Sequence, residues 1–228
     1  MKIKELFKKI LYPERCTSNA LIKSLQKRGA FIGSGTVFFD SIGTKIDVQY
    51  PWLIHIGCNC QFSGKITIMT HDYSWCVIKA KSGEILGCSG YVIIGDNVFV
   101  GYGSTLLKGT NIGDGSIIGA GSIVSGTIPS GEVWGGSPAR YICKIDEYQK
   151  RREAKQIEEA FKLYLAYVKS FGKEPGEQVF LEYISLFVDL SNSANTKKYL
   201  SRLRLMNNYD KTIEFYKNKN HYLILFHP

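Results

Sequence analysis

Aliphatic residues recur at every sixth position through the middle of the chain. Six consecutive steps fit this spacing, at Ile94, Val100, Leu106, Ile112, Ile118 and Val124. Glycine directly follows most of these positions, and the residue four places on is small or β-branched. A helix repeats at about 3.6 residues and a strand at two, so neither accounts for a period of six. The spacing predicts short strands joined by tight corners, with the aliphatic side chain inward and glycine tolerating the corner.

A second series precedes the first at the same spacing. The residues that share this step of six are Ile32, Phe38, Thr44, Tyr50, Ile56, Phe62 and Ile68. The residues four places after these steps, which are also expected to face inward, are Thr36, Ile42, Val48, Ile54, Cys60, Ile66 and Asp72. Each coil buries its inner face only against neighbouring coils, so several are needed for stability. The thirteen hexads predict a mainly β protein, a left-handed parallel β-helix of a little over four triangular coils.

The coil is expected to span residues 31–143, with one interruption. Residues 74–93 fall out of register and should protrude as a loop. Residues 1–30 form an N-terminal helical segment, in which Thr17 or Ser18 caps a helix that ends at Gly29.

Residues 144–228 form a mostly helical C-terminal extension. Its first helix should run from about Ile145 to Phe171, with further helical stretches near 177–190 and 195–206. The apolar run YLILF at 222–226 is either a strand or a segment that docks on the coil.

Charge is distributed unevenly along the chain, whose net charge is +9. Residues 1–30 carry eight basic and two acidic side chains, whereas residues 31–143 carry six and seven. A nearly neutral coil argues against a nucleic-acid groove in it, while the basic flanks suit an anionic surface or substrate. No run of apolar residues is long enough to span a bilayer, and the N-terminus lacks a secretory signal pattern, so we expect a cytoplasmic protein.

The six cysteines do not have the spacing of a metal site or a redox motif. They are Cys16, Cys58, Cys60, Cys76, Cys88 and Cys143. No C-x-x-C pair occurs, so buried, reduced thiols and no metal are the expectation.

Three motifs carry a resemblance to a known family. The stretches IGDNVFVG, IGDGSIIGAGSIV and GGSPAR are similar to those of hexapeptide-repeat acyltransferases, including the maltose/galactoside acetyltransferase group. The segment THDYSW at 70–75 resembles the active-site segment of surface-polysaccharide O-acetyltransferases. The resemblance covers about residues 18–150. It implies a homotrimer that binds acetyl-CoA between subunits and transfers the acetyl group directly to a sugar hydroxyl.

The resemblance makes His71 the general base, and the chemistry of the imidazole agrees. A neutral imidazole can take the proton of a hydroxyl as it attacks a thioester. Asp72 either orients that imidazole or accepts backbone amides where the coil opens, and Glu84 is an alternative orienting carboxylate. Tyr73 and Trp75 either form a platform for a sugar ring or pack at the root of the loop.

The resemblance also assigns the acetyl-CoA contacts. Tyr102 matches a backbone contact to the thioester end, Ala120 a contact to the pantetheine arm, and Ser125 with Gly126 the contact of the next coil. Arg140 matches a basic residue near the phosphates. Two basic residues frequent in the family are replaced by Gly126 and Cys143 here, and Lys144 is a candidate substitute for the second.

Other functions compete with O-acetylation of a sugar in capsule or O-antigen biosynthesis. N-acylation of an amino-sugar nucleotide is one, and a β-helix that serves as an interaction scaffold is a non-enzymatic one. A γ-type carbonic anhydrase needs three histidine ligands, which this chain, with two of its four histidines in the tail, does not supply.

The first eleven residues give a further partner to consider. Ile3, Leu6, Phe7, Ile10 and Leu11 fall on one helical face among four lysines. This segment either contacts an anionic inner membrane surface weakly or packs on the next helix or the first coil.

Overall fold

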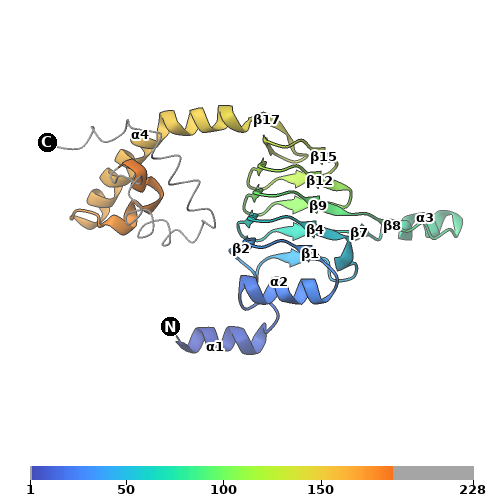
Figure 1. The fold of residues 1–228 in the computed structure, drawn as a ribbon. Coiled ribbons are helices and arrows are strands. Elements are labelled where there is room, and N and C mark those ends of the chain that lie inside the picture. Colours follow the sequence, from blue (N-terminus) through green and yellow to red (C-terminus); the bar gives the residue numbers. More distant parts are fainter. Residues whose placement is uncertain (1, 187–228) are drawn as a thin grey trace. The chain divides into compact units, whose positions relative to one another are not determined.

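The computed structural model describes residues 2–186, in which three sheets of short, mostly parallel strands wind into a left-handed β-helix (Figure 1). The first sheet contains β1 (Phe31–Ile32), β4 (Ile54–Ile56), β9 (Val92–Ile94), β12 (Thr110–Ile112) and β15 (Thr127–Ile128). The second contains β2 (Val37–Phe38), β5 (Gln61–Phe62), β10 (Phe99–Val100), β13 (Ile117–Ile118), β16 (Glu132–Gly135) and β17 (Arg140–Lys144). The third contains β3 (Lys45–Ile46), β6 (Thr67–Ile68), β11 (Thr105–Leu106) and β14 (Ile123–Val124).

The inward aliphatics form the core, as the six-residue period predicts. All six from Ile94 to Val124 are at most 2% exposed. Each pairs with a residue of a neighbouring coil, as Val100 does with Ile118 and Leu106 with Val124. In the lower coils the rings of Phe38 and Phe62 stack with centroids 4.4 Å apart.

The glycines that follow these aliphatics serve a purpose other than the predicted one. A Cβ on Gly113 would lie 2.5 Å from the backbone nitrogen of Ser130 in the next coil. Gly95, Gly101 and Gly113 therefore allow close approach of neighbouring coils, whereas a Cβ on Gly119 would meet no atom closer than 3.5 Å. Positive φ, which glycine accepts without strain, occurs instead two residues later, as at Gly115 (φ 64°).

The predicted register is wrong between residues 39 and 53. The third rung is Ile46, which pairs with Ile68, and not Thr44. Tyr50 belongs to no rung, because residues 47–50 make a wide corner that leads into a 3-10 helix, η1 (Pro51–Leu53). Val48, expected to face inward, is 54% exposed.

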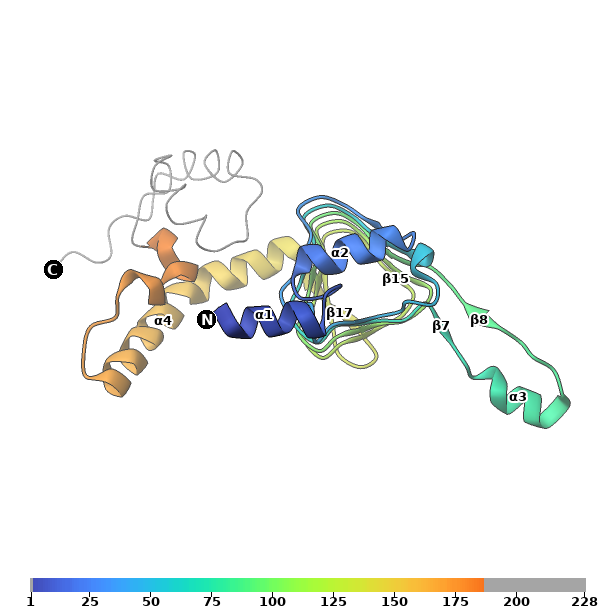
Figure 2. The same cartoon turned by 90° about the horizontal axis from the view of Figure 1, so that it is seen from below.

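The two ends of the coil are closed differently. Helix α2 (Ser18–Lys27) lies across the first coil and buries Leu21 and Leu25 there (Figure 2). Thr17 caps this helix by accepting a hydrogen bond from the Ala20 amide, as predicted. At the other end β17 runs antiparallel to β16. Helix α1 (Lys2–Leu11) precedes α2.

Residues between β7 (His71–Asp72) and β9 leave the coil as an arm (Figures 1 and 2). The arm carries helix α3 (Trp75–Ser82), which has no buried residue, and returns through β8 (Cys88–Ser89). The sequence predicts a loop here, and the structure adds a helix within it.

The chain divides into two compact units, residues 1–148 and 149–228. Helix α4 (Ile145–Phe171) has the predicted bounds, and its second part is supported by ion pairs Arg152–Glu159 and Lys162–Glu158, each 2.5 Å. Two 3-10 helices follow, η2 (Glu177–Val179) and η3 (Leu181–Leu186). The predicted helical stretch at 195–206 and the YLILF run lie outside the described residues. No helix within residues 2–186 is long and apolar enough to cross a membrane.

The close approach of coils predicts a large effect for Gly113→Ala. Its Cβ would meet backbone, which cannot move without separating two coils, so we expect a loss of about 1–3 kcal/mol or more in the free energy of unfolding. Gly87→Ala is the matched control, because a Cβ on this glycine of the arm meets nothing within 4 Å. Chemical denaturation followed by circular dichroism measures both. Equal stabilities would contradict the close-approach explanation.

Candidate functional site

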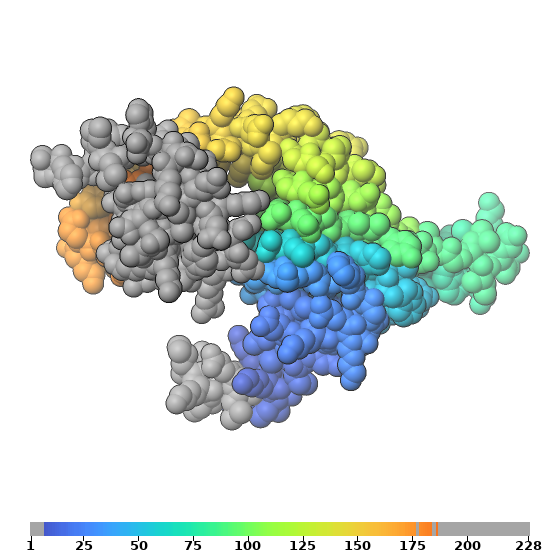
Figure 3. Space-filling view, in the orientation of Figure 1, coloured from blue at the N-terminus to red at the C-terminus, as the bar shows by residue number. Residues whose placement is uncertain are grey.

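His71 lies at the point where the chain leaves the coil. It belongs to β7, which pairs antiparallel with β8, so that His71 lies opposite Ser89. The root of the arm is tied to the coil by a 2.8 Å hydrogen bond from the Gly90 amide to the Thr70 carbonyl. The space-filling view shows the arm extending from the coil beyond this root (Figure 3).

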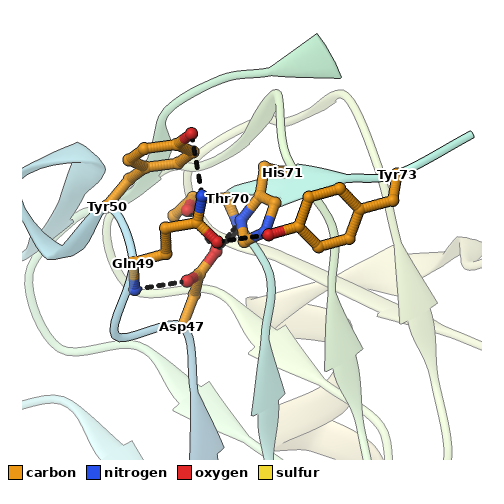
Figure 4. Close-up of polar contacts among 6 residues, drawn as sticks. All are labelled: Asp47, Gln49, Tyr50, Thr70, His71 and Tyr73. Atoms are coloured by element: carbon orange, nitrogen blue, oxygen red, sulfur yellow. Dashed lines mark hydrogen bonds and ion pairs between the residues drawn. The ribbon is translucent and has the colours of Figure 1, made fainter. Parts of the chain in front are cut away.

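Asp47 holds the His71 imidazole. Its Oδ2 contacts the Nδ1 atom of His71 and accepts hydrogen bonds from the Thr70 hydroxyl at 2.5 Å and the Thr70 amide at 3.2 Å (Figure 4). The pairing of Ile46 with Ile68 places the residues after both strands at one corner of the coil. Both side chains are largely enclosed, with 8% of Asp47 and 15% of His71 exposed.

Hydrogen bonds keep the Asp47 carboxylate charged in spite of its enclosure. Burial alone would raise the pKa of this carboxyl. Asp47 accepts hydrogen bonds from Thr70, from the backbone N–H of Gln49 (2.8 Å) and from His71. Together they outweigh the effect of burial, so that the pKa of the carboxyl lies below its ordinary value. Asp47 is therefore ionised at neutral pH.

An ionised Asp47 determines which imidazole nitrogen is basic. A carboxylate only accepts hydrogen bonds, so the proton of a neutral imidazole resides on Nδ1. The lone pair is then on Nε2, to which no group among residues 2–186 is hydrogen-bonded. The pair thus presents a base with a fixed tautomer.

Two tyrosines flank the His71 ring, and Gln49 links them. The rings of Tyr50 and Tyr73 each lie 5.0 Å from the imidazole centroid, at 72° and 84° to its plane. The Gln49 side chain donates to the Tyr50 hydroxyl at 2.9 Å and accepts from the Tyr73 hydroxyl at 2.5 Å (Figure 4). Packing edge-to-face and this amide bridge restrict rotation of the imidazole.

The imidazole lines a hollow of about 380 Å³ on the surface of the coil. Its walls are residues of β3, β6 and β7 and the residues that follow them. They are Lys45, Ile46, Asp47, Thr67, Ile68, Met69, His71, Asp72 and Tyr73. This volume is within the range of small-molecule sites, about 300–1,000 Å³.

The other residues predicted around His71 are distributed along the arm. Asp72 forms an ion pair with Lys108 at 2.9 Å and accepts from the Ser74 amide at 2.9 Å, so it satisfies a backbone amide and does not bond the imidazole. Hydrogen bonds from Ser74 and Lys108 hold its pKa well below the ordinary range. Trp75 packs edge-on against Tyr73 with centroids 6.3 Å apart. Glu84 lies beyond α3 and bonds with Ser82 at 3.3 Å.

Four of the five residues predicted to bind acetyl-CoA lie at two corners that flank the third sheet. Tyr102 and Ala120 follow β10 and β13, and the Tyr102 carbonyl accepts from the Gly121 amide at 2.8 Å. Ser125 and Gly126 follow β14, on the same corner as the segment from Met69 to His71 that follows β6. Arg140 begins β17, is exposed, and donates to the Ala139 carbonyl at 3.1 Å.

Sequence reasoning missed Asp47, Gln49, Tyr50 and Thr70 as parts of the site. The signal for Asp47 was present, since it directly follows an aliphatic in the segment TKIDV. With Ile46 as the rung residue, the repeat places Asp47 beside Met69 and Thr70. The tyrosine bridge depends on the wide corner after Asp47, which no repeat pattern encodes.

No three acidic, cysteine or histidine side chains converge within the described part of the chain in a way that could hold a metal ion. All six cysteines are free, and Cys60 and Cys143 are buried. Burial raises the pKa of the Cys60 thiol, which points into the core.

Comparison with known proteins finds a hexapeptide repeat within the coil and several acetyltransferases that are similar to part of the chain. A family model described as the hexapeptide repeat of succinyl-transferase matches residues 91–125, from β9 to β14. The putative acetyltransferase YvoF of Bacillus subtilis is 34% identical over 105 residues, 46% of this chain and 56% of YvoF. The galactoside O-acetyltransferase of Escherichia coli is 33% identical over 122 residues, 54% of this chain and 58% of that enzyme. The chain therefore resembles the hexapeptide-repeat acyltransferases.

The chain is also similar to a protein of another kind. The mitochondrial gamma carbonic anhydrase 2 of Arabidopsis thaliana is 35% identical over 111 residues, 47% of this chain and 37% of that protein. The chain spans between about a third and three fifths of the length of these three relatives. Each match covers about half of this chain, so similarity alone does not choose between the activities of these relatives.

The tautomer argument predicts a specific effect of Asp47→Asn. An asparagine amide can donate to Nδ1, which would move the imidazole proton to Nε2. NMR spectra of protein with ¹⁵N-labelled histidine report the tautomer directly, and only four histidines contribute. We expect Nδ1–H in the native protein and its loss in the variant.

Asp72→Asn is the matched control for this experiment. It neutralises the neighbouring carboxylate, which contacts Lys108 and Ser74, and should leave the His71 tautomer unchanged. A native spectrum showing the Nε2–H tautomer would contradict the role assigned to Asp47.

Proposed function

We propose that the protein is an acetyl-CoA-dependent O-acetyltransferase that acetylates a sugar hydroxyl in surface-polysaccharide biosynthesis. The observation that carries this proposal is the Asp47–His71 pair beside the hollow, which leaves Nε2 as a base. Supporting observations are the coil itself and the resemblance to a galactoside O-acetyltransferase.

The proposed reaction is a direct transfer. The Nε2 atom of His71 takes the proton of the acceptor hydroxyl as its oxygen attacks the thioester carbonyl. Backbone N–H groups of the coil stabilise the oxyanion that forms. The carbon–sulfur bond then breaks, and the imidazolium returns its proton to the departing thiolate. Asp47 stabilises the transient imidazolium without taking its proton.

The acyl donor is proposed to lie along the third sheet. Tyr102 and Ala120 line one of its edges, and Ser125 and Gly126 the other, at the corner that also carries His71. Arg140 is placed near the phosphates of acetyl-CoA, where an exposed guanidinium suits an anion. Tyr73 and Trp75 would support the acceptor ring, and Glu84 has no assigned contact with either substrate.

Two alternatives stay open on the same geometry. A base that accepts a proton from a hydroxyl also accepts one from an ammonium group, so N-acylation of an amino-sugar nucleotide is the second enzymatic candidate. An interaction scaffold is the non-enzymatic candidate, and it predicts no thermal stabilisation by acetyl-CoA. Products from paired amino and hydroxy acceptors, identified by mass spectrometry, separate the enzymatic candidates.

The assembly is proposed to be a homotrimer, with acetyl-CoA between subunits. Exposed apolar side chains on the outer faces of the coil, such as Phe31 (61%) and Phe99 (39%), are available for such contacts. The proposed location is cytoplasmic, with a weak peripheral contact to the inner membrane through α1. The apolar residues Phe7, Ile10 and Leu11 of this helix are 58–66% exposed, which favours the membrane contact over packing on the coil.

His71→Ala should lower turnover by about two to four orders of magnitude while the fold is preserved. Release of CoA with sugar acceptors measures the rate, and light scattering should give a trimer mass for both proteins. His55→Ala is the matched control, since this second described histidine is exposed and its ring contacts Phe31 and Tyr91. A folded His71→Ala variant that loses less than tenfold in turnover would exclude His71 as the base.

The membrane contact predicts salt-sensitive binding to vesicles that contain anionic lipid. Each lysine near such a surface contributes up to about 1 kcal/mol, and an apolar face contributes by burial. Co-sedimentation of the full chain should fall at high salt and in the variant Ile10→Glu/Leu11→Glu. Val77→Glu, on an exposed apolar position of α3, serves as control. Equal binding by all three proteins would refute the role of α1.

A further inference from the structure

Lys45 places a positive charge in the wall of the hollow that holds His71. It is the outward residue of β3, opposite Thr67 of β6, while its neighbour Ile46 faces the core. Its side chain is exposed and stands on the same strand end that supplies Asp47. A ligand bound at His71 would therefore meet this ammonium group.

The carboxylates of the hollow are already engaged. Asp47 is bonded to Thr70, His71 and Gln49, and only 8% of its side chain is exposed. Asp72 is paired with Lys108. Neither carboxylate forms an ion pair with Lys45, which leaves this ammonium as the charge in the wall that is available to a ligand.

The other cations on the described coil do not line the hollow. Lys65 lies over the ring of Tyr102 at 5.7 Å, Lys108 bonds Asp72, and Arg140 donates to a backbone carbonyl. The net charge of residues 31–143 is −1, so the coil as a whole does not attract anions. Attraction at the hollow is thus a local property of Lys45.

We propose that the acceptor is an acidic sugar, whose carboxylate or phosphate binds Lys45 while a hydroxyl of the same unit reaches Nε2 of His71. This inference rests on the proposed acetyltransferase function and narrows its substrate class. A flexible ammonium is a point charge that suits either anion, and a charge-assisted hydrogen bond also fixes the orientation of the ring. The neighbouring Met69, 38% exposed, offers apolar contact to the ring.

The experiment compares three acceptors with one ring: methyl glucoside, methyl glucuronide and the 6-phosphate of methyl glucoside. Transfer from acetyl-CoA is measured as product by mass spectrometry, with kcat/KM for each acceptor. We expect one acidic acceptor to exceed the neutral one by about tenfold or more. The carboxylate and phosphate arms identify which anion is preferred.

Variants of Lys45 test the assignment. Lys45→Met should reduce kcat/KM for the acidic acceptor to the level of the neutral one. Lys45→Arg should retain the preference, and Lys45→Glu should reverse it. The control Lys23→Met removes an exposed lysine of α2, away from the hollow, and should change nothing.

Failure of this inference is distinguishable from failure of the proposed function. The same sugars are titrated into ¹⁵N-histidine-labelled protein without acetyl-CoA, and the His71 signal reports binding independently of transfer. Absence of transfer and of thermal stabilisation by acetyl-CoA would refute the acetyltransferase function. The proposal of an acidic acceptor would be overturned if the native protein bound acidic and neutral sugars with equal affinity. It would also be overturned if Lys45→Met lowered kcat/KM equally for all three acceptors.

Discussion

Hydrogen bonding between successive coils is the constraint on which the rest of the structure depends. A two-residue strand has no stability by itself, and its N–H and C=O groups are satisfied only by the strands of the coils on either side. Backbones must then approach closely, which Gly113 permits and a larger residue there would prevent. The neighbours of any corner residue are consequently fixed by the rung that precedes it.

The pairing of successive coils also determines where the candidate site lies. Because Ile46 pairs with Ile68, the residues that follow them meet at one corner, and Asp47 reaches Thr70 and His71 across 23 and 24 positions of sequence. Enclosing a carboxylate there would be costly without partners, and Thr70 supplies two of its hydrogen bonds. Thr70 is fully buried, so its contribution is structural as well as electrostatic.

Sequence reasoning predicted the coil well and the site only in part. Between Ile94 and Val124 the period is unbroken, and every inward residue was identified. Between Phe38 and Ile56 the separation of 18 residues is a multiple of six, so the pattern predicted two rungs there, Thr44 and Tyr50. The structure fits one rung there, Ile46, and uses the remaining length in the wide corner that carries Asp47, Gln49 and Tyr50. The repeat could have located Asp47, which directly follows a rung residue, but Gln49 and Tyr50 belong to an insertion between repeats.

Two departures from the repeat meet at His71: the wide corner at residues 47–50 and the arm between β7 and β9. On an uninterrupted coil the chain turns directly into the next strand, as it does after Leu106, where Gly109 N–H bonds Tyr91. At His71 the chain instead enters the two-stranded root of the arm, so its backbone is fixed by β8 while its side chain points toward the wide corner. The wide corner supplies the carboxylate and one flanking ring, and the arm supplies the other ring through Tyr73. Both departures from the repeat are needed to hold Nδ1 and leave Nε2 available at the hollow.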